Sequence, residues 1–182
     1  MHQNLTFLFD DSTGNTSLFV VIKGYARVDK VEKAFELVNE LEKASLLDRV
    51  QVLVLGSLID SLSKTRSVDL EYAIHKAEWL LDRIIAKYEN DQVHRNERDV
   101  DSWVFECVIR LWSKRHTLEA AERIDALRRQ MEELNAKYPK LFRPMKNINL
   151  LAMDAWALSG NEHAGKHAMA ILRKTPAPSS RF

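Results

Sequence analysis

The chain has 182 residues, of which 46% are hydrophobic and 29% are charged, and its formal net charge is +1 at pH 7. This length and apolar content allow a buried core, so a chain that is disordered throughout is not expected. The one cysteine, Cys107, cannot form an intramolecular disulfide and is expected to be a small buried side chain. Five Gly and four Pro in a chain dominated by Ala, Leu, Glu, Lys and Arg favour helices over strands.

The first residues, MHQNLTFLFDD, lack the features of a leader sequence or a membrane anchor. They have no positively charged start, and their apolar run is too short for a secretory signal or a membrane span. They are not Arg-rich and acid-free, as an organellar transit peptide would be. We expect residues 1–15 to form an irregular cap or the stub of an earlier repeat. From this stretch alone, the expected location is the cytoplasm or nucleus, unless the true N-terminus is missing.

Four segments between residues 16 and 174 share one pattern. Each has an apolar pair, a large apolar anchor three residues later, and then a small residue. The segments are VVIKGYAR (20–27), SLIDSLSK (57–64), CVIRLWSK (107–114) and LAMDAWAL (151–158), and their anchors are Tyr25, Leu62, Trp112 and Trp156. A helical stripe follows each segment. A small residue stands nine positions after the anchor at Ala34, Ala121 and Gly165, and at Ala77 if a six-residue insertion is allowed.

A large anchor that faces a small residue allows two antiparallel helices to pack closely. We therefore predict an all-α fold, a right-handed α-solenoid of about four helix-turn-helix repeats over residues 16–174. The anchors are 37, 50 and 44 residues apart, and the extra length lies at residues 87–99 and 137–147. Two prolines stop the helix in the second of these stretches. Residues 175–182, TPAPSSRF, are expected to form a disordered tail.

The first copy, VIKGYARVDKVEKAFELVNELEKASL, resembles a pentatricopeptide repeat. It has the apolar pair, Gly24-Tyr25, a small residue, a basic residue, a short loop and then Ala-Phe-Glu-Leu. The later copies keep this frame, and DAWALSG and AILRK are similar to a Trp-bearing variant of the pattern. The resemblance covers residues 16–174. It implies a single-stranded RNA binder in which first helices line a concave surface and each repeat addresses one base. It also implies a role in RNA processing, stability or translation in a mitochondrion or plastid.

The resemblance further implies which positions face the RNA bases. In the family, one reader lies three residues before the second member of the apolar pair, and a helper immediately precedes the next repeat. Carried over, the pairs are Phe19 with Gln51, Gly56 with Asp101, and Glu106 with Met145, while Leu150 has no following repeat. Asp101 has the hydrogen-bonding chemistry that is usual in the family, and Phe19 is suited to stacking on a base.

A basic residue stands two positions after the anchor in three repeats, at Arg27, Lys64 and Lys114. On a concave face these cations would form a ladder suited to phosphates. Residues 101–182 carry 14 basic against 9 acidic residues, a mild surplus that also favours an anionic partner. Cations near the end of a helix equally offset its dipole. The two interpretations of the ladder stay open at this point.

No other motif indicates catalysis, a cofactor or a metal. His163 and His167 are four residues apart but lack an indicated third ligand, so a solvated pair is favoured over a metal site. The sequence has no phosphate-binding Gly loop, no Gly-x-Ser-x-Gly elbow and no Cys-x-x-Cys pair, so an enzyme is not expected. Trp112 and Trp156 are expected in the core and Trp79 is expected to be packed. Trp103 is a stacking candidate whose placement in the core is favoured.

Two other functions fit the same repeat pattern. A scaffold like those built from tetratricopeptide repeats shares the hairpin geometry and would bind protein partners in its concave groove. The near-neutral charge and the atypical base-reading residues favour this alternative, whereas the motif of the first repeat favours RNA. A degenerate repeat fragment without an independent function is the third possibility.

Overall fold

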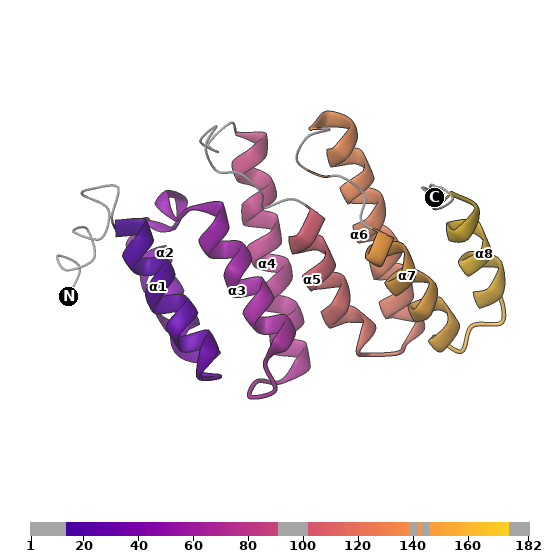
Figure 1. The fold of residues 1–182 in the computed structure, drawn as a ribbon, viewed down its shortest axis with the longest axis horizontal. Helices are drawn as coiled ribbons and strands as arrows, with labels where there is room; N and C mark the ends of the chain where they lie inside the picture. The colour runs from indigo at the N-terminus through magenta and orange to yellow at the C-terminus, as the bar shows by residue number, and fades with distance from the viewer. Residues whose placement is uncertain (1–13, 91–101, 139–141, 143–145, 175–182) are drawn as a thin grey trace, which may run out of the picture. The chain divides into compact units, whose positions relative to one another are not determined.

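The structure is a computed structural model that describes residues 14–90, 102–138, 142 and 146–174. All regular structure in these residues is helical, with eight α-helices, one short 3-10 helix and no strand (Figure 1). The expectation of an all-α protein is therefore confirmed. The chain divides into two compact units, residues 1–100 (unit 1) and residues 101–182 (unit 2). Most of the segments expected to form a cap and a tail, 1–15 and 175–182, lie outside the described residues.

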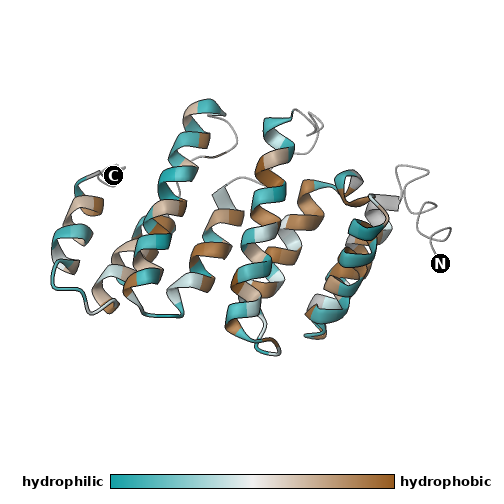
Figure 2. Ribbon diagram, turned by 180° about the vertical axis from the view of Figure 1, so that it is seen from behind, coloured by the Kyte–Doolittle hydropathy of each residue, from teal (hydrophilic) through white to brown (hydrophobic). Residues whose placement is uncertain are grey.

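Unit 1 is built from two helical hairpins. Its elements are α1 (Gly14–Arg27), α2 (Val31–Lys43), η3 (Leu47–Arg49), α3 (Val52–Lys64) and α4 (Leu70–Glu89). α1 packs against α2 and α3, and α3 packs against α4. Seen from the two opposite sides in Figures 1 and 2, α1 and α3 form one layer, and α2 and α4 lie behind them. The first helices of the two hairpins are therefore direct neighbours.

The helices of unit 1 follow from their apolar spacing and their ends. In α2, the buried side chains recur with the period of one helix face, at Val31, Ala34, Phe35, Val38 and Leu41. The alternation of polar and apolar residues along α2 and α4 is visible in Figure 2. α4 begins at Asp69, whose carboxylate accepts hydrogen bonds from the main-chain N–H groups of Glu71 and Tyr72. This side chain satisfies two donors that a helix start leaves without partners.

Unit 2 also contains two pairs of helices. They are α5 (Ser102–Ser113), α6 (Leu118–Lys137), α7 (Lys146–Leu158) and α8 (Ala164–Lys174). α5 packs against α6 and α7, α6 against α7, and α7 against α8. Phe142, between α6 and α7, is fully buried and meets the Phe105 ring edge-on, with ring centroids 6.1 Å apart. The connection after α6 thus contributes a core side chain.

The four segments that share the sequence pattern fall in α1, α3, α5 and α7, with Lys114 one residue beyond α5. The anchors Leu62, Trp112 and Trp156 are buried, and Tyr25 is half-buried. Three of the small residues are buried as well, namely Ala34, Ala77 and Ala121. The expected burial of Cys107 is confirmed.

The expected stripe fails on the last helix. Met169 and Leu172 are 47% and 50% exposed, and Gly165 is also exposed. The physical reason is that, among the helices in unit 2, α8 has its main packing partner in α7 alone, so only one side of it is covered. Ile171 is the buried apolar side chain of this helix. In the described part of the chain, no helix combines the length and apolar character needed to span a membrane.

Candidate nucleic-acid interface

A hollow of about 390 Å³ lies in unit 1 where α1 and α3 end. Two of the three cations of the predicted ladder, Arg27 and Lys64, line it together. The lining residues are Lys23, Arg27, Asp29, Asp60, Ser61, Lys64 and Thr65. We call this site the cationic hollow, because three basic side chains there face two carboxylates. The sequence pattern therefore located two residues that the fold brings to one surface, although 37 positions separate them.

The two ladder cations of the hollow differ in their partners. The Lys64 ammonium lies 2.6 Å from the Asp60 carboxylate, one helical turn earlier, and its side chain is 66% exposed. Ion pairs between side chains four residues apart on a helix are worth only about 0.3–0.5 kcal/mol, and the Lys64 end is exposed, so an anion can compete for the ammonium. The Arg27 guanidinium is exposed and makes no hydrogen bond or ion pair with any described residue. Arg27 is therefore the group in the hollow most available to a ligand.

The turn residue Asp29 fixes the rim of the hollow. Its carboxylate accepts hydrogen bonds from the hydroxyls of Thr65 and Ser67, the latter at 3.3 Å. Its main-chain carbonyl accepts a second hydrogen bond from the Ser67 hydroxyl at 3.0 Å. Asp29 has a φ of 53°, in the left-handed region that Asp tolerates better than most residues. These bonds tie the turn after α1 to the turn after α3, and thereby hold Arg27 and Lys64 near each other.

The third ladder cation belongs to the other unit. Lys114 follows α5 directly, is exposed, and donates its main-chain N–H to the Leu111 carbonyl at 3.2 Å. It does not line the cationic hollow. Arg27 and Lys64 are the last residues of α1 and α3, so both also sit where a cation offsets the helix dipole.

The positions that the resemblance implies as base readers are not gathered in this hollow. Phe19 lies within α1, and Gln51 is the half-buried N-cap of α3. Gly56 is buried in the middle of α3. The Glu106 side chain in α5 is only 8% exposed, and its carboxylate lies 2.5 Å from the Arg110 guanidinium. Asp101 and Met145 lie outside the described residues, and Leu150 is exposed on α7.

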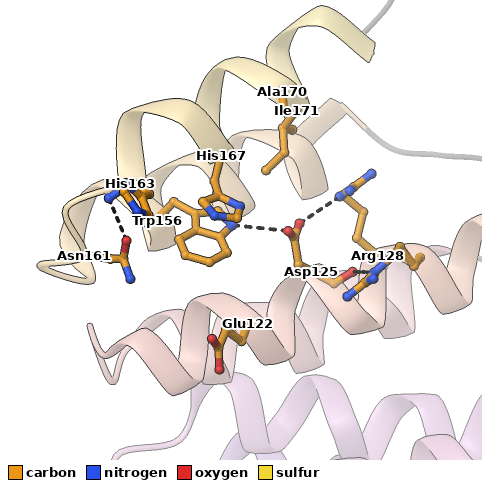
Figure 3. A pocket seen from close by; sticks show the side chains of 10 residues that line it. Glu122, Asp125, Arg128, Trp156, Asn161, His163, His167, Ala170 and Ile171 are labelled. Carbon is orange, nitrogen blue, oxygen red and sulfur yellow. Dashed lines mark hydrogen bonds and ion pairs between the residues drawn. The ribbon is translucent and has the colours of Figure 1, made fainter.

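A second hollow of about 440 Å³ lies in unit 2, between α6, α7 and α8; we call it the unit 2 pocket. The imidazole of His167 stacks on the indole of Trp156, with ring centroids 3.9 Å apart and planes within 10° (Figure 3). The indole Nε1–H donates to the Asp125 carboxylate at 3.3 Å, and the other oxygen of this carboxylate lies 3.3 Å from Nε of Arg128. The buried side chain of Trp156 is thus hydrogen-bonded to Asp125 of α6 and stacked against His167 of α8.

Sequence reasoning found only part of this pocket. The expectation of Trp156 in the core is confirmed. His163 and His167 are both exposed, as expected for a solvated pair, but His167 also covers an indole face. No group of three potential metal-ligating side chains occurs among the residues that the structure describes. Trp79 and Trp103 are half-buried, and Trp79 lies beside the cations of Lys76 and Arg83.

Comparison of the chain with protein-family models, with curated proteins and with solved structures finds no match.

Proposed function

We propose that this protein is a pentatricopeptide-type α-solenoid that binds single-stranded RNA by its phosphates. The observation that carries the proposal is the convergence of Arg27 and Lys64 on the cationic hollow. The resemblance of the first repeat to an RNA-binding repeat gives the class of ligand. By the same resemblance, the proposed role is RNA processing, stability or translation in a mitochondrion or plastid.

The chemistry of the hollow suits a phosphodiester backbone. An arginine guanidinium offers a planar set of donors that matches two phosphate oxygens, whereas a lysine ammonium acts as a mobile point charge. Arg27 and Lys64 supply one of each, and both side chains are exposed. The hydroxyls of Ser61 and Thr65 line the same hollow but already donate to the Ser57 carbonyl and the Asp29 carboxylate, so the phosphate contacts would come from the two cations. Such contacts position a strand without reading its bases.

The burial of two implied base readers, Gly56 and Glu106, supports a binder with little sequence preference. Gly56 has no side chain and is buried, and the Glu106 carboxylate is already paired with Arg110. The binding free energy would therefore come chiefly from phosphates, as for proteins that shelter single strands without selecting them.

The helical pairs observed in each unit are the building block that a solenoid needs. In unit 1 the first helices α1 and α3 are neighbours, and in unit 2 the first helices α5 and α7 are neighbours. We propose that the same relationship continues along the chain as a right-handed solenoid, with the first helices on the concave side.

Charge reversal in the hollow tests the proposal. We expect the double variant Arg27→Glu and Lys64→Glu to bind a short single-stranded RNA at least about tenfold more weakly than the unchanged chain at low ionic strength. The matched control is Lys33→Glu with Lys43→Glu, which makes the same change in net charge at exposed positions of α2. Equal losses in both double variants, or no RNA binding by the unchanged chain at low salt, would refute the proposal.

A protein-binding scaffold of tetratricopeptide type is the second candidate, and exposed apolar side chains favour it. Val20 and Val21 on α1 are 62% and 45% exposed, and Leu53 on α3 is 42% exposed. An amphipathic helix of a partner could dock its apolar side on such residues. If this function holds, Val20→Ser with Val21→Ser should abolish capture of a protein partner, whereas the charge reversal at Arg27 and Lys64 should leave that capture unchanged.

A further inference from the structure

The unit 2 pocket has the size and construction of a small-ligand site. Its volume of about 440 Å³ falls in the range usual for such sites. Side chains from three helices and from the turn between α7 and α8 converge on it, and all of them belong to one unit. Neither the sequence pattern nor the proposed phosphate contacts in unit 1 account for this arrangement.

The stacked rings form a platform that a ligand can reach. The indole of Trp156 is buried and is held by its hydrogen bond to Asp125. One face of the His167 imidazole lies on this indole, and His167 is nevertheless exposed, which allows a ligand to reach the imidazole. A planar ring can therefore extend the stack by lying on His167. Stacking on an aromatic side chain is the usual way in which proteins bind an unpaired base.

Two charged groups of the pocket remain available to a ligand. Asp125 and Arg128 are engaged with each other, and Arg128 also pairs with Glu132 at 2.5 Å. Arg129 donates from Nε to the Asp125 carbonyl at 3.3 Å, and its terminal amino groups have no partner among the described residues. The exposed carboxylate of Glu122 likewise contacts no described cation.

These two groups belong to α6, the helix that also carries Asp125. Glu122 and Arg129 are seven residues apart on α6, which separates their Cα atoms by about 10 Å along the helix axis. Asp125, to which the indole is bonded, lies between them in the sequence. In Figure 3, Glu122 lies on α6 below Trp156, and Asp125 reaches the indole from the same helix. The pocket thus combines an acceptor, a stacking ring and a cation.

We infer that the unit 2 pocket binds a nucleotide, with its base stacked on His167, its phosphate on Arg129 and an exocyclic amino group of the base on Glu122. A carboxylate accepts hydrogen bonds and donates none, so bases with an amino group bind better than uracil, which has none. The nucleotide can be a free nucleoside monophosphate or one residue of an RNA strand. Only the second source rests on the proposed function.

The test uses the full chain and isothermal titration with adenosine and uridine 5′-monophosphates, alongside oligoadenylate and oligouridylate single strands. We expect the adenine ligand of either form to bind about two- to tenfold more tightly than its uracil counterpart, the range that one hydrogen bond provides. Glu122→Ala should remove this difference. Arg129→Glu and His167→Leu should each weaken binding of the adenine ligand about tenfold. The matched control is Arg173→Glu, an exposed arginine of α8 outside the pocket.

The two ligand forms separate the sources and the two proposals. If Arg129→Glu weakens binding of the monophosphate, the ligand of the pocket is a free nucleotide. If Arg129→Glu weakens binding of the oligonucleotide only, the ligand is one residue of an RNA strand. If Arg129→Glu and His167→Leu weaken neither ligand form more than Arg173→Glu does, the inference is wrong. That result would leave the role of Arg27 and Lys64 intact. Conversely, if the unit 2 pocket binds nucleotides but the Arg27 and Lys64 reversal leaves the affinity for the oligonucleotides unchanged, only the phosphate site in unit 1 is refuted. Circular dichroism of each variant verifies that the helices are retained.

Discussion

Asp29 and Ser67 join the turns of two successive hairpins, since the Ser67 hydroxyl donates to the Asp29 carbonyl at 3.0 Å. The carboxylate of Asp29 also accepts from the same hydroxyl and from Thr65. These contacts lie at the rim of the cationic hollow. The geometry of the hollow therefore depends on one side chain that the sequence pattern places in an ordinary loop.

Replacement of Asp29 by alanine should destabilise unit 1 by about 1–3 kcal/mol, because the Thr65 hydroxyl loses this acceptor, the Ser67 hydroxyl keeps only the main-chain carbonyl of its two acceptors at this residue, and alanine is strained at a φ of 53°. Asp29→Gly removes the same carboxylate without backbone strain and should cost less. Asp29→Asn, which keeps an acceptor oxygen and tolerates this φ, should remain close to the unchanged chain. Urea unfolding of the three variants measures the order. An alanine variant as stable as the asparagine variant would show that the tie contributes nothing.

Phe142 is the side chain whose truncation should be most harmful in unit 2. It is fully buried, meets Phe105 edge-on and lies 6.3 Å from the Tyr138 ring. Phe142→Ala should therefore lower the free energy of unfolding by about 3–5 kcal/mol, and Phe142→Leu by clearly less. A matched control is Tyr138→Ala, at a half-buried position of the same cluster. Urea denaturation followed by circular dichroism gives the comparison, and equal losses for Phe142→Ala and Tyr138→Ala would contradict the core role of Phe142.

Apolar periodicity was sufficient to predict helices that bury a single side, such as α2 and α4, whereas α3 and α5 bury residues on most of their sides. The stripe of α2 and the buried anchors Leu62, Trp112 and Trp156 are read directly from spacing. Phe142 was not anticipated, since two prolines beside it predict only that a helix stops there. Where the helical pattern stops, the sequence does not indicate whether the side chains of the connecting segment pack into the core.

The candidate sites, like the fold, could be predicted from the sequence only in part. The cation that stands two residues after the anchor in three repeats located Arg27 and Lys64, because equivalent helix ends meet when first helices pack side by side. The stack of His167 on Trp156 could not be predicted from the sequence, since it depends on how α8 turns back onto α7. Similarly, the burial of Gly56 and Glu106 depends on which side of α3 and α5 is covered, and apolar residues on several sides of these helices leave that open.

Alkaline pH should destabilise unit 1 partly through Tyr72. Partial burial of the Tyr72 side chain, and secondarily the negative charge of Glu32, raise the pKa of this phenol above its ordinary value of 10.0. The folded chain thus holds the phenol proton more tightly than the unfolded chain does. This contribution to stability is fully present below about pH 10 and is lost as the pH rises through the raised pKa.

The check is the unfolding free energy of Tyr72→Phe and of the unchanged chain, measured between about pH 8 and pH 11. The loss of stability with rising pH should be smaller in Tyr72→Phe, because phenylalanine has no proton to release. Glu32→Gln keeps the phenol but removes the charge that helps to raise its pKa, so it should fall between the two. Identical pH profiles for all three chains would rule out a contribution from Tyr72.

The salt dependence of RNA binding should report how many phosphates the cationic hollow contacts. For a single strand, the logarithm of the binding constant falls against the logarithm of salt concentration with a slope of about −0.7 per neutralised phosphate. Arg27→Gln and Lys64→Gln should each reduce the steepness by about 0.7 if each side chain contacts one phosphate. Lys33→Gln, at an exposed position of α2, should leave the slope unchanged. A slope that stays the same in the Arg27 and Lys64 variants would mean that these cations serve only the ends of α1 and α3, where they offset the helix dipole. RNA, if bound, would then have to be held elsewhere on the chain.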